Sequence, residues 1–209
     1  MNSEYWESKF KEEGAMWKFE PSDSALLTLD LFKSNHIRNI LIPGVGYGRN
    51  AKLFYDNGFN VTGIEISQSA INLAKENGLN FTIHHGSVLS MPFDNSRYEG
   101  IFCYALIHLL NNIERKAFLL NCYNQLAIGG IMVFTVATTQ MSMYGSGKKL
   151  SKNRFEIMKG LNVYFYDRKA IEKEFSPFGL IEYREIDEPI KHLEGYAPLK
   201  LEYVICKKQ

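Results

Sequence analysis

The sequence predicts an α/β fold with a doubly wound, mostly parallel sheet, and three observations support this prediction. Short apolar runs alternate with helix-like segments through residues 39–136. An Asn-Gly pair follows each of the first two helix-like segments after residue 39, where the C-terminus of a helix favours glycine. The last two apolar runs have no helix-like segment between them. Alternating strands and helices favour parallel pairing, whereas strands joined directly pair antiparallel.

The elements of the first half follow from the spacing of apolar residues. After an aromatic N-terminal segment, residues 22–34 have helical spacing, with Ser22 or Ser24 as the N-cap. The apolar runs that follow are short, as in buried parallel strands. In chain order we expect a strand at 39–42, a helix at 49–57, a strand at 60–65, a helix at 68–76 and a strand at 80–84.

The second half continues this alternation and then departs from it. We expect a strand at 99–103, a helix at 111–126, a buried strand at 131–136, a helix at 167–175, and an antiparallel pair of strands near 179–187 and 199–206. Residues 138–166 are aromatic and basic and are predicted to be irregular. The chain should form a single domain over residues 1–209, with the aromatic segment and first helix within residues 1–35.

The composition narrows the classes of partner and compartment. The formal net charge is +1 without long runs of one sign, which weighs against nucleic-acid and membrane-surface partners. The three cysteines are odd in number and scattered, which favours neither a disulfide framework nor a zinc site. The sequence has no export-type N-terminus and no apolar run near the roughly 18 residues of a membrane span. We therefore expect a cytoplasmic protein, monomeric or homodimeric, that acts on a small molecule and binds no metal.

The segment Asn39-Ile-Leu-Ile-Pro-Gly-Val-Gly-Tyr-Gly-Arg-Asn50 indicates a cofactor site. Its three glycines can take left-handed backbone angles and let a ligand approach the main chain, although a tight turn alone would also use glycine. The helix that follows directs unpaired N–H groups at the loop, which favours a bound carboxylate or phosphate. Glu65 ends the next strand, 21 residues after Gly44, where an acidic side chain can accept hydrogen bonds from ribose hydroxyls. The alternative for Glu65 is a solvated carboxylate at a strand end.

The glycine spacing separates two kinds of nucleotide site. Dinucleotide binding usually requires G-x-G-x-x-G, which would put the third glycine at position 49, where this chain has Arg49. The pattern present is G-x-G-x-G, ending at Gly48. A nicotinamide-dependent oxidoreductase is therefore disfavoured.

With this loop the chain resembles the class I S-adenosylmethionine-dependent methyltransferases. The segment 41–48 is similar to the L-x-P-G-x-G-x-G loop of thiopurine and halide/thiol methyltransferases, and Tyr5-Trp6-Glu7 with Trp17 resembles the entry segment of that group. The triplet Gly48-Arg49-Asn50 is shared with tellurite-resistance methyltransferases. The resemblance implies a Rossmann-like sheet of seven strands in the order 3-2-1-4-5-7-6. It also implies S-adenosylmethionine as cofactor and a small acceptor of the thiol, selenium, tellurium or halide type.

The resemblance also suggests which residues contact the cofactor. They are Gly44, Val45, Gly46, Gly48, Asn50, Glu65, Ile66, Ser87, Val88, Tyr104 and Trp17. An aromatic face beside a sulfonium is favourable, which is the reason for including Trp17 and Tyr104. The chain departs from the usual pattern at Ile42, where many relatives carry an acid near the cofactor ammonium, and at Ser87, where an aspartate is common.

The segment from Cys103 to His108 leaves the carboxyl end of the fourth strand, where open α/β sheets bind ligands. We expect methyl transfer at this face, with Tyr104 and His108 as candidate catalytic residues. His108 could serve as a general base. The alternative is a histidine that is hydrogen-bonded in the transition from loop to helix. His84 and His85 point to opposite faces of a strand, which argues against a metal site.

The segment 138–166 is long enough to be a lid or a substrate-binding loop. Its lysines and arginine could attract an anionic substrate, or they could simply face water. Two further functions stay open: a non-catalytic S-adenosylmethionine-binding module, and a nucleic-acid methyltransferase. The second is weakened by the near-neutral charge and by the lack of a Pro-Pro-aromatic motif at Tyr104.

Overall fold

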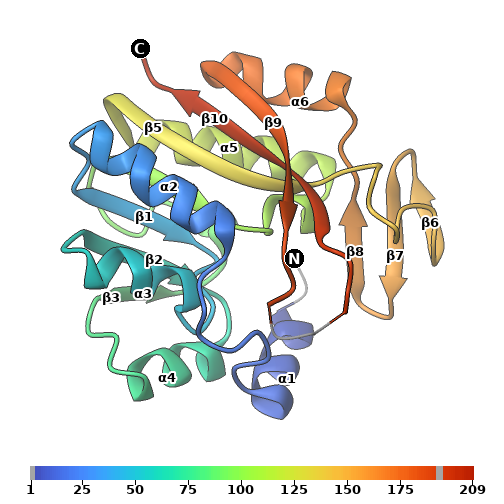
Figure 1. Ribbon diagram of the computed structural model, residues 1–209, viewed down its shortest axis with the longest axis horizontal. Helices are drawn as coiled ribbons and strands as arrows, with labels where there is room; N and C mark the ends of the chain where they lie inside the picture. The colour runs from blue at the N-terminus through green and yellow to red at the C-terminus, as the bar shows by residue number, and fades with distance from the viewer. Residues whose placement is uncertain (1–2, 192–194) are drawn as a thin grey trace.

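The computed structural model of the chain describes residues 3–191 and 195–209. Its centre is a seven-stranded sheet in the order β3-β2-β1-β4-β5-β10-β9 (Figure 1). The strands of this sheet are β1 (Asn39–Pro43), β2 (Asn60–Glu65), β3 (Thr82–His85), β4 (Tyr98–Cys103), β5 (Leu126–Ala137), β9 (Leu180–Glu188) and β10 (Leu199–Lys207). The helices are α1 (Ser3–Glu13), α2 (Asp23–Ser34), α3 (Arg49–Asp56), α4 (Gln68–Glu76), α5 (Asn112–Gln125) and α6 (Arg168–Phe175).

Strand pairing confirms the strand order that the family resemblance implies. The first five strands pair in parallel, whereas β10 lies antiparallel to both β5 and β9. Since β9 and β10 are the sixth and seventh strands of this sheet along the chain, the order is 3-2-1-4-5-7-6. Parallel strands end at one edge of the sheet, so the loops after β1, β2 and β4 meet there.

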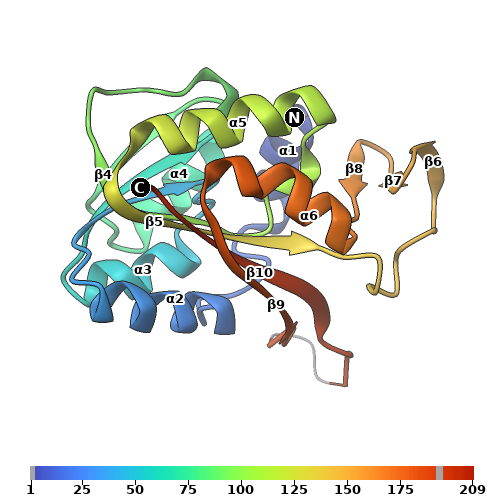
Figure 2. The ribbon, with the colours of Figure 1, turned by 90° about the horizontal axis from the view of Figure 1, so that it is seen from above.

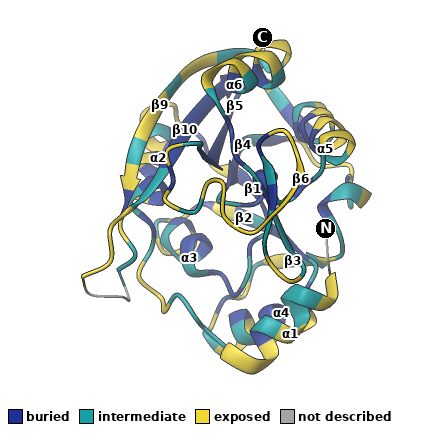
Figure 3. Ribbon diagram, turned by 90° about the vertical axis from the view of Figure 1, so that its right-hand side faces the viewer, coloured by how far each residue is buried: buried dark blue, intermediate teal, exposed yellow. Residues whose placement is uncertain are grey.

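Helices cover both faces of the sheet, with α2 and α3 on one side and α5 and α6 on the other (Figure 2). On the first side the rings of Phe54 and Phe102 lie 5.6 Å apart, and on the second those of Phe134 and Phe175 lie 5.4 Å apart. Each of these buried aromatic side chains contributes about 1.5–3 kcal/mol of transfer free energy. Figure 3 shows the result: the central strands are buried and the outer faces of the helices are exposed. The loops at the sheet edge therefore extend from strands that are buried and well packed.

The prediction that residues 138–166 are irregular is wrong for residues 148–164. It contains a three-stranded antiparallel sheet of β6 (Lys148–Ser151), β7 (Arg154–Met158) and β8 (Leu161–Tyr164), at one side of the main sheet (Figure 1). Its aromatic residues form a separate small core, in which the ring of Tyr144 lies 5.5 Å from Phe155 and 5.4 Å from Phe165. Alternation over only four or five residues per strand is a weak pattern, which explains the error.

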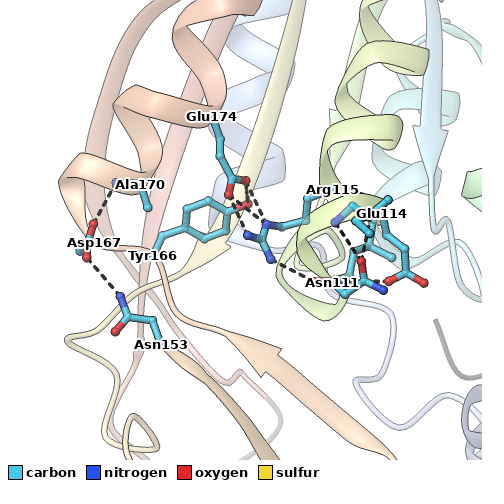
Figure 4. A network of polar contacts seen from close by, with 10 residues as sticks. Asn111, Glu114, Arg115, Asn153, Tyr166, Asp167, Ala170 and Glu174 are labelled. Carbon is cyan, nitrogen blue, oxygen red and sulfur yellow. Dashed lines mark hydrogen bonds and ion pairs between the residues drawn. The ribbon is translucent and has the colours of Figure 1, made fainter. Parts of the chain in front are cut away.

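A buried ion pair ties the small sheet to the two helices beside it (Figure 4). Arg115 of α5 is 3% exposed, and its guanidinium donates to both carboxylate oxygens of Glu174 in α6, at 2.7 and 2.9 Å. The ring of Tyr164 in β8 lies 3.8 Å from the guanidinium carbon, and Tyr166 Oη donates to the same carboxylate at 3.0 Å. These contacts hold the position of β8 relative to α5 and α6.

A second polar link joins the turn between β6 and β7 to the start of α6. Asn153 Nδ2 donates to Asp167 Oδ2 at 3.1 Å, and Asp167 Oδ1 accepts from the Ala170 N–H at 2.9 Å as the N-cap of α6 (Figure 4). The aromatic N-terminal segment is also more regular than expected, because it begins with α1.

Candidate active site

A cavity of about 640 Å³ opens at the edge where β1, β2 and β4 end. Its lining comes from the loop after β1, the end of β2, the segment after β4, the N-terminal region, the neighbourhood of the small sheet, and the connection from β9 to β10. The lining residues are Trp6, Phe10, Trp17, Ile42, Gly44, Val45, Gly46, Tyr47, Arg49, Asn50, Ile64, Glu65, Ile66, Val88, Tyr104, Ala105, Leu106, Leu109, Met143, Met158, Pro189, Ile190 and Leu199. Its volume lies in the range of small-molecule sites.

The three loop glycines have positive φ angles of 69°, 58° and 84°, but they serve different purposes. A Cβ atom at Gly44 would collide with Leu106, and one at Gly48 would collide with Leu79. A Cβ at Gly46 would meet only Phe10, at 3.7 Å. Gly44 and Gly48 are therefore required for packing as well as for conformation, whereas Gly46 leaves open space against the cavity.

Glu65 is buried, with 5% exposure, and its carboxylate binds backbone N–H groups of both the glycine loop and the segment after β2. Oε2 accepts from the Gly46 N–H at 2.8 Å, and Oε1 accepts from the N–H groups of Ile66 and Ser67 at 2.8 and 2.9 Å. Burial raises the pKa of this carboxyl group, and the three N–H donors act in the opposite direction. A carboxylate offers about four acceptor positions, so Glu65 can accept three backbone N–H groups and still accept a hydrogen bond from a ligand.

The rest of the loop is held by hydrogen bonds to neighbouring elements. The N–H groups of Gly44 and Val45 both donate to the Ile64 carbonyl oxygen, at 2.8 and 3.0 Å. Asn50, at the start of α3, accepts from the Ser22 N–H at 2.9 Å. Ser22 is also the N-cap of α2, so Asn50 joins the two helix N-termini.

Aromatic side chains from the N-terminal region form one wall of the cavity. The rings of Trp17 and Tyr47 are stacked with centroids 6.3 Å apart, and Phe10 lies edge-on to both. Tyr47 Oη accepts from the Trp17 N–H at 3.1 Å and donates to the Lys18 carbonyl oxygen. Burial raises the pKa of Tyr47 to about 12. These contacts place Trp17 against the glycine loop.

Glu7 attaches α1 to the N-terminus of α4. Its carboxylate accepts from the hydroxyls of Ser67 and Ser69, at 2.7 and 2.6 Å, and from the Ser69 N–H at 3.2 Å. The hydrogen bonds from Ser69 and Ser67 lower the pKa of Glu7 to about 2. A negative side chain at this helix end also suits the helix dipole.

The segment after β4 begins with a residue in an uncommon conformation. Ala105 has φ 49°, and its N–H donates to the buried Thr135 hydroxyl at 2.9 Å. Left-handed non-glycine residues often occur at functional sites. Next to it, the Tyr104 ring lies under the Arg49 guanidinium, 5.3 Å from ring centroid to guanidinium carbon. Burial raises the pKa of Tyr104 to about 12, so its hydroxyl stays protonated at neutral pH.

His108 is buried and does not line the cavity among the residues described. Its Nδ1 accepts from the Ala137 N–H at 3.1 Å, which leaves Nε2 to carry the proton. Burial lowers the pKa of His108 to about 4. These observations favour the alternative reading, a histidine hydrogen-bonded where the chain enters a helical turn, because a general base works best with a pKa near the working pH.

The cavity brings together most, but not all, of the residues that the sequence suggests. Those that line it are Gly44, Val45, Gly46, Asn50, Glu65, Ile66, Val88, Tyr104 and Trp17. Gly48, Ser87 and His108 are not part of its lining. Ser87 instead caps the short 3₁₀ helix Val88–Ser90 by accepting from the Leu89 N–H at 3.2 Å.

Sequence reasoning missed the part of the lining that lies away from the glycine loop. Met143 precedes the small sheet and Met158 is the last residue of β7. Leu109 follows β4, Ile190 lies in the connection from β9 to β10, and Leu199 is the first residue of β10. The methionines lie within the segment expected to form a lid, which was a usable signal. The residues near β10 show no pattern that would indicate a site.

The three cysteines and the pair His84 and His85 do not form a site in the described part of the chain. Cys103, Cys122 and Cys206 are buried free thiols, and burial raises the pKa of each. His84 and His85 contact Asp94 and the Ile66 carbonyl oxygen, respectively. Within residues 3–191 and 195–209, no three His, Cys, Asp or Glu side chains are grouped as a metal would require. In the same ranges no helix has the length and apolarity needed to span a membrane.

The sheet order, the glycine loop after β1 and the buried carboxylate at the end of β2 define the class I methyltransferase fold. Residues 40–130 match the Methyltransf_25 family model, described as a methyltransferase domain. The match over residues 40–130 and the shared fold confirm that the chain resembles the S-adenosylmethionine-dependent methyltransferases, as its sequence suggested. No curated protein matches the chain significantly.

Solved structures share the fold at low sequence identity. The Burkholderia thailandensis 1,6-didemethyltoxoflavin-N1-methyltransferase, with S-adenosylhomocysteine bound, is 14% identical with a TM-score of 0.74, over 99% of this chain and 87% of that one. The CcbJ methyltransferase of Streptomyces caelestis is 16% identical with a TM-score of 0.74, over 100% and 99%. TehB from Haemophilus influenzae is 13% identical with a TM-score of 0.67, over 98% and 67%.

Proposed function

We propose that this protein transfers the methyl group of S-adenosylmethionine to a small-molecule acceptor bound in the same cavity. The observation that carries the proposal is the continuity of the cavity. The glycine loop and Glu65 line one end, and the apolar side chains Leu109, Met143 and Met158 line the other. A nucleoside at the first end would present its methyl group to an acceptor at the second.

The residues at the first end fit this cofactor. Glu65 has an acceptor position left for a ribose hydroxyl, and the space beside Gly46 suits the amino-acid tail. Val88 lines the cavity where an adenine ring would lie. When bound, the cofactor supplies an electrophilic methyl group and a positive sulfonium. Trp17 and Tyr104 can stabilise that cation by roughly 0.5–2 kcal/mol.

Catalysis in this proposal depends mainly on position. An acceptor lone pair must lie about 3 Å from the methyl carbon, in line with the departing sulfur. Soft acceptors such as thiols, selenium or tellurium compounds and halides need little help from a base. A neutral His108 outside the cavity lining agrees with such acceptors. The apolar acceptor end also supports a small molecule rather than a polynucleotide.

We infer that residues 1–209 act as one domain and that the segment 138–166 works as the lid over the acceptor. Met143 and Met158 support this inference, since both line the cavity from that segment. Lys148, Lys149 and Lys152 are exposed and absent from the lining, so they contribute at most a distant attraction for anions. The three free thiols support a reducing compartment such as the cytoplasm.

Turnover with S-adenosylmethionine labelled in its methyl group tests the proposal. The acceptor panel should contain thiols, selenols, tellurite, halides, phenols and amines, and the readouts are labelled product and S-adenosylhomocysteine. We expect label transfer to at least one member of the panel. Binding of S-adenosylhomocysteine without transfer to any acceptor would favour a non-catalytic module. Binding of NADH in its place would favour an oxidoreductase.

A further inference from the structure

Two charged side chains line the cavity within the described part of the chain, Glu65 and Arg49. The Glu65 carboxylate already accepts three backbone N–H groups. Arg49 is partly buried, and its guanidinium lies over the Tyr104 ring. No carboxylate in residues 3–191 or 195–209 forms an ion pair with Arg49. The cavity thus contains a positive group whose charge the described side chains do not neutralise by direct contact.

The two carboxylates that act electrostatically on Tyr104 are engaged elsewhere. Glu188 accepts from the N–H groups of Asp23 and Ser24, at 2.8 and 3.1 Å, and from the Ser24 hydroxyl at 2.6 Å. Asp23 pairs with Lys191 at 2.8 Å. Asp23 lies in the first turn of α2, and Glu188, the last residue of β9, binds the N-terminus of that helix. Neither carboxylate forms an ion pair with Arg49, which leaves Arg49 available to a ligand.

Tyr104 adds a neutral donor beside this cation. Its hydroxyl is protonated at neutral pH, because burial raises its pKa to about 12. A guanidinium and a phenol side by side can both donate hydrogen bonds to a single anionic group. Hydrogen bonds with an ionised donor or acceptor are stronger than those between neutral groups. Ile42, which also lines the cavity, supplies no competing negative charge.

The bound cofactor would strengthen the preference for an anion. A sulfonium adds a second positive charge to a partly enclosed cavity that holds Arg49, and charges interact more strongly there than in bulk water. An acceptor with a negative group lowers the electrostatic energy of this arrangement, whereas a neutral or cationic acceptor does not.

We propose that Arg49, assisted by Tyr104, is an anion-binding subsite for the methyl acceptor, and that the acceptor is an apolar molecule carrying one carboxylate-like group. The anionic group would lie at Arg49, and the apolar body would lie against Leu109, Met143 and Met158. This inference rests on the proposed function, since it assigns a substrate class to the same cavity. The carboxylate of the cofactor's amino-acid tail is a second anion that fits Arg49. The experiment distinguishes binding of this carboxylate from binding of the acceptor's anionic group.

The test uses matched probes on the full-length protein saturated with S-adenosylhomocysteine. The probes are benzoate, 3-phenylpropionate and indole-3-acetate, each paired with its uncharged amide, with binding followed by calorimetry. We expect the wild type to bind at least one acid ten-fold or more tightly than its amide. Arg49→Gln should remove that preference, and Arg49→Lys should retain part of it. Lys52→Gln, which removes an exposed cation from the same helix, should leave it unchanged.

The affinity for S-adenosylhomocysteine identifies which anion Arg49 binds. If Arg49→Gln leaves this affinity within about threefold of wild type, while the acid preference disappears, the inference holds. If the variant binds S-adenosylhomocysteine more than ten-fold more weakly and keeps the acid preference, Arg49 binds the cofactor and the inference is overturned. A wild type that prefers no acid over its amide also overturns it. Failure of the wild type to bind S-adenosylhomocysteine would instead reject the proposed function.

Discussion

The two ends of the cavity are built in different ways. The end around the glycine loop comes mainly from the stretch Gly44 to Ile66, with Trp17, Val88 and Tyr104 beside it, and it includes backbone groups and one buried carboxylate. The opposite end is assembled from side chains at three distant places in the chain: Leu109, the pair Met143 and Met158, and the residues before and at the start of β10. A site made of backbone allows little variation in its ligand, whereas a site made of side chains can change with few substitutions. We infer that the first end suits a constant cofactor and the second a particular acceptor.

The largest expected effect is on the free energy of unfolding, through the ion pair that holds the small sheet beside the second end of the cavity. Glu174→Ala removes the carboxylate that pairs with the buried Arg115, and an uncompensated buried charge costs about 3–5 kcal/mol. We expect the free energy of unfolding, measured by urea denaturation, to fall by about that amount. Lys173→Ala, an exposed position on the same helix, should change it by less than about 0.5 kcal/mol. A loss below 1 kcal/mol for Glu174→Ala would show that the network does not support the small sheet.

His108 is buried outside the cavity lining and should make stability depend on pH. Its pKa is about 4 in the folded protein and has an ordinary value of 6.5 in the unfolded chain, so the unfolded chain binds more protons between these values. Stability should therefore be complete above pH 6.5 and fall as the pH drops toward 4, by about 1.4 kcal/mol per pH unit at most. Urea denaturation at a series of pH values checks this slope.

Variants of His108 separate structure from catalysis. Asn can accept the Ala137 N–H in place of Nδ1, so His108→Asn should lose this part of the pH dependence and keep methyl transfer within about threefold. His108→Ala leaves the N–H unpaired and should cost about 1–3 kcal/mol of stability. A fall of 10²–10⁴ in turnover for the asparagine variant would instead assign His108 the role of general base.

Glu65→Gln tests the first end of the cavity. The variant loses the charge that accepts three backbone N–H groups, and hydrogen bonds to charged groups contribute about 1.5–3 kcal/mol. We expect S-adenosylhomocysteine to bind about 30-fold more weakly by calorimetry, with the acid-over-amide preference of the probes unchanged. Glu76→Gln, an exposed residue of α4, is the control. Equal affinity in the Glu65 variant would reject its role in cofactor binding.

The smallest effect is expected at the second end. Met158 is 54% exposed, so Met158→Ala should cost less than about 1 kcal/mol of stability. The KM for the acceptor should rise several-fold, and the affinity for S-adenosylhomocysteine should not change. A change in cofactor affinity without a change in KM would mean that the two ends are not separate subsites.

The same contrast explains how much could be predicted from the sequence. The strands and helices around the glycine loop have strong local signals, such as Gly44 and Gly46 after a buried strand and Asn57-Gly58 at a helix end, and the structure places these elements within one or two residues of the expected bounds. Because the β1–α3–β2 unit is local, its pattern also indicated where a cofactor would bind.

The second end could not be predicted in this way. Phe155 and Phe165 pack in a small core that depends on contacts between short strands, and no window of sequence contains that information. Ile190 and Leu199 reach the cavity because β9 and β10 are the last two strands at one side of the main sheet. The role that we propose for Arg49 depends on which carboxylates are already paired, and that is a property of the folded chain.

A crystal structure of the complex with S-adenosylhomocysteine tests the central claim most directly. The account predicts that the ribose hydroxyls lie within about 2.6–3.2 Å of the Glu65 carboxylate and that the amino-acid tail lies against Gly44 and Gly46. Density for the nucleoside elsewhere in the molecule, or a ribose without contact to Glu65, would contradict it.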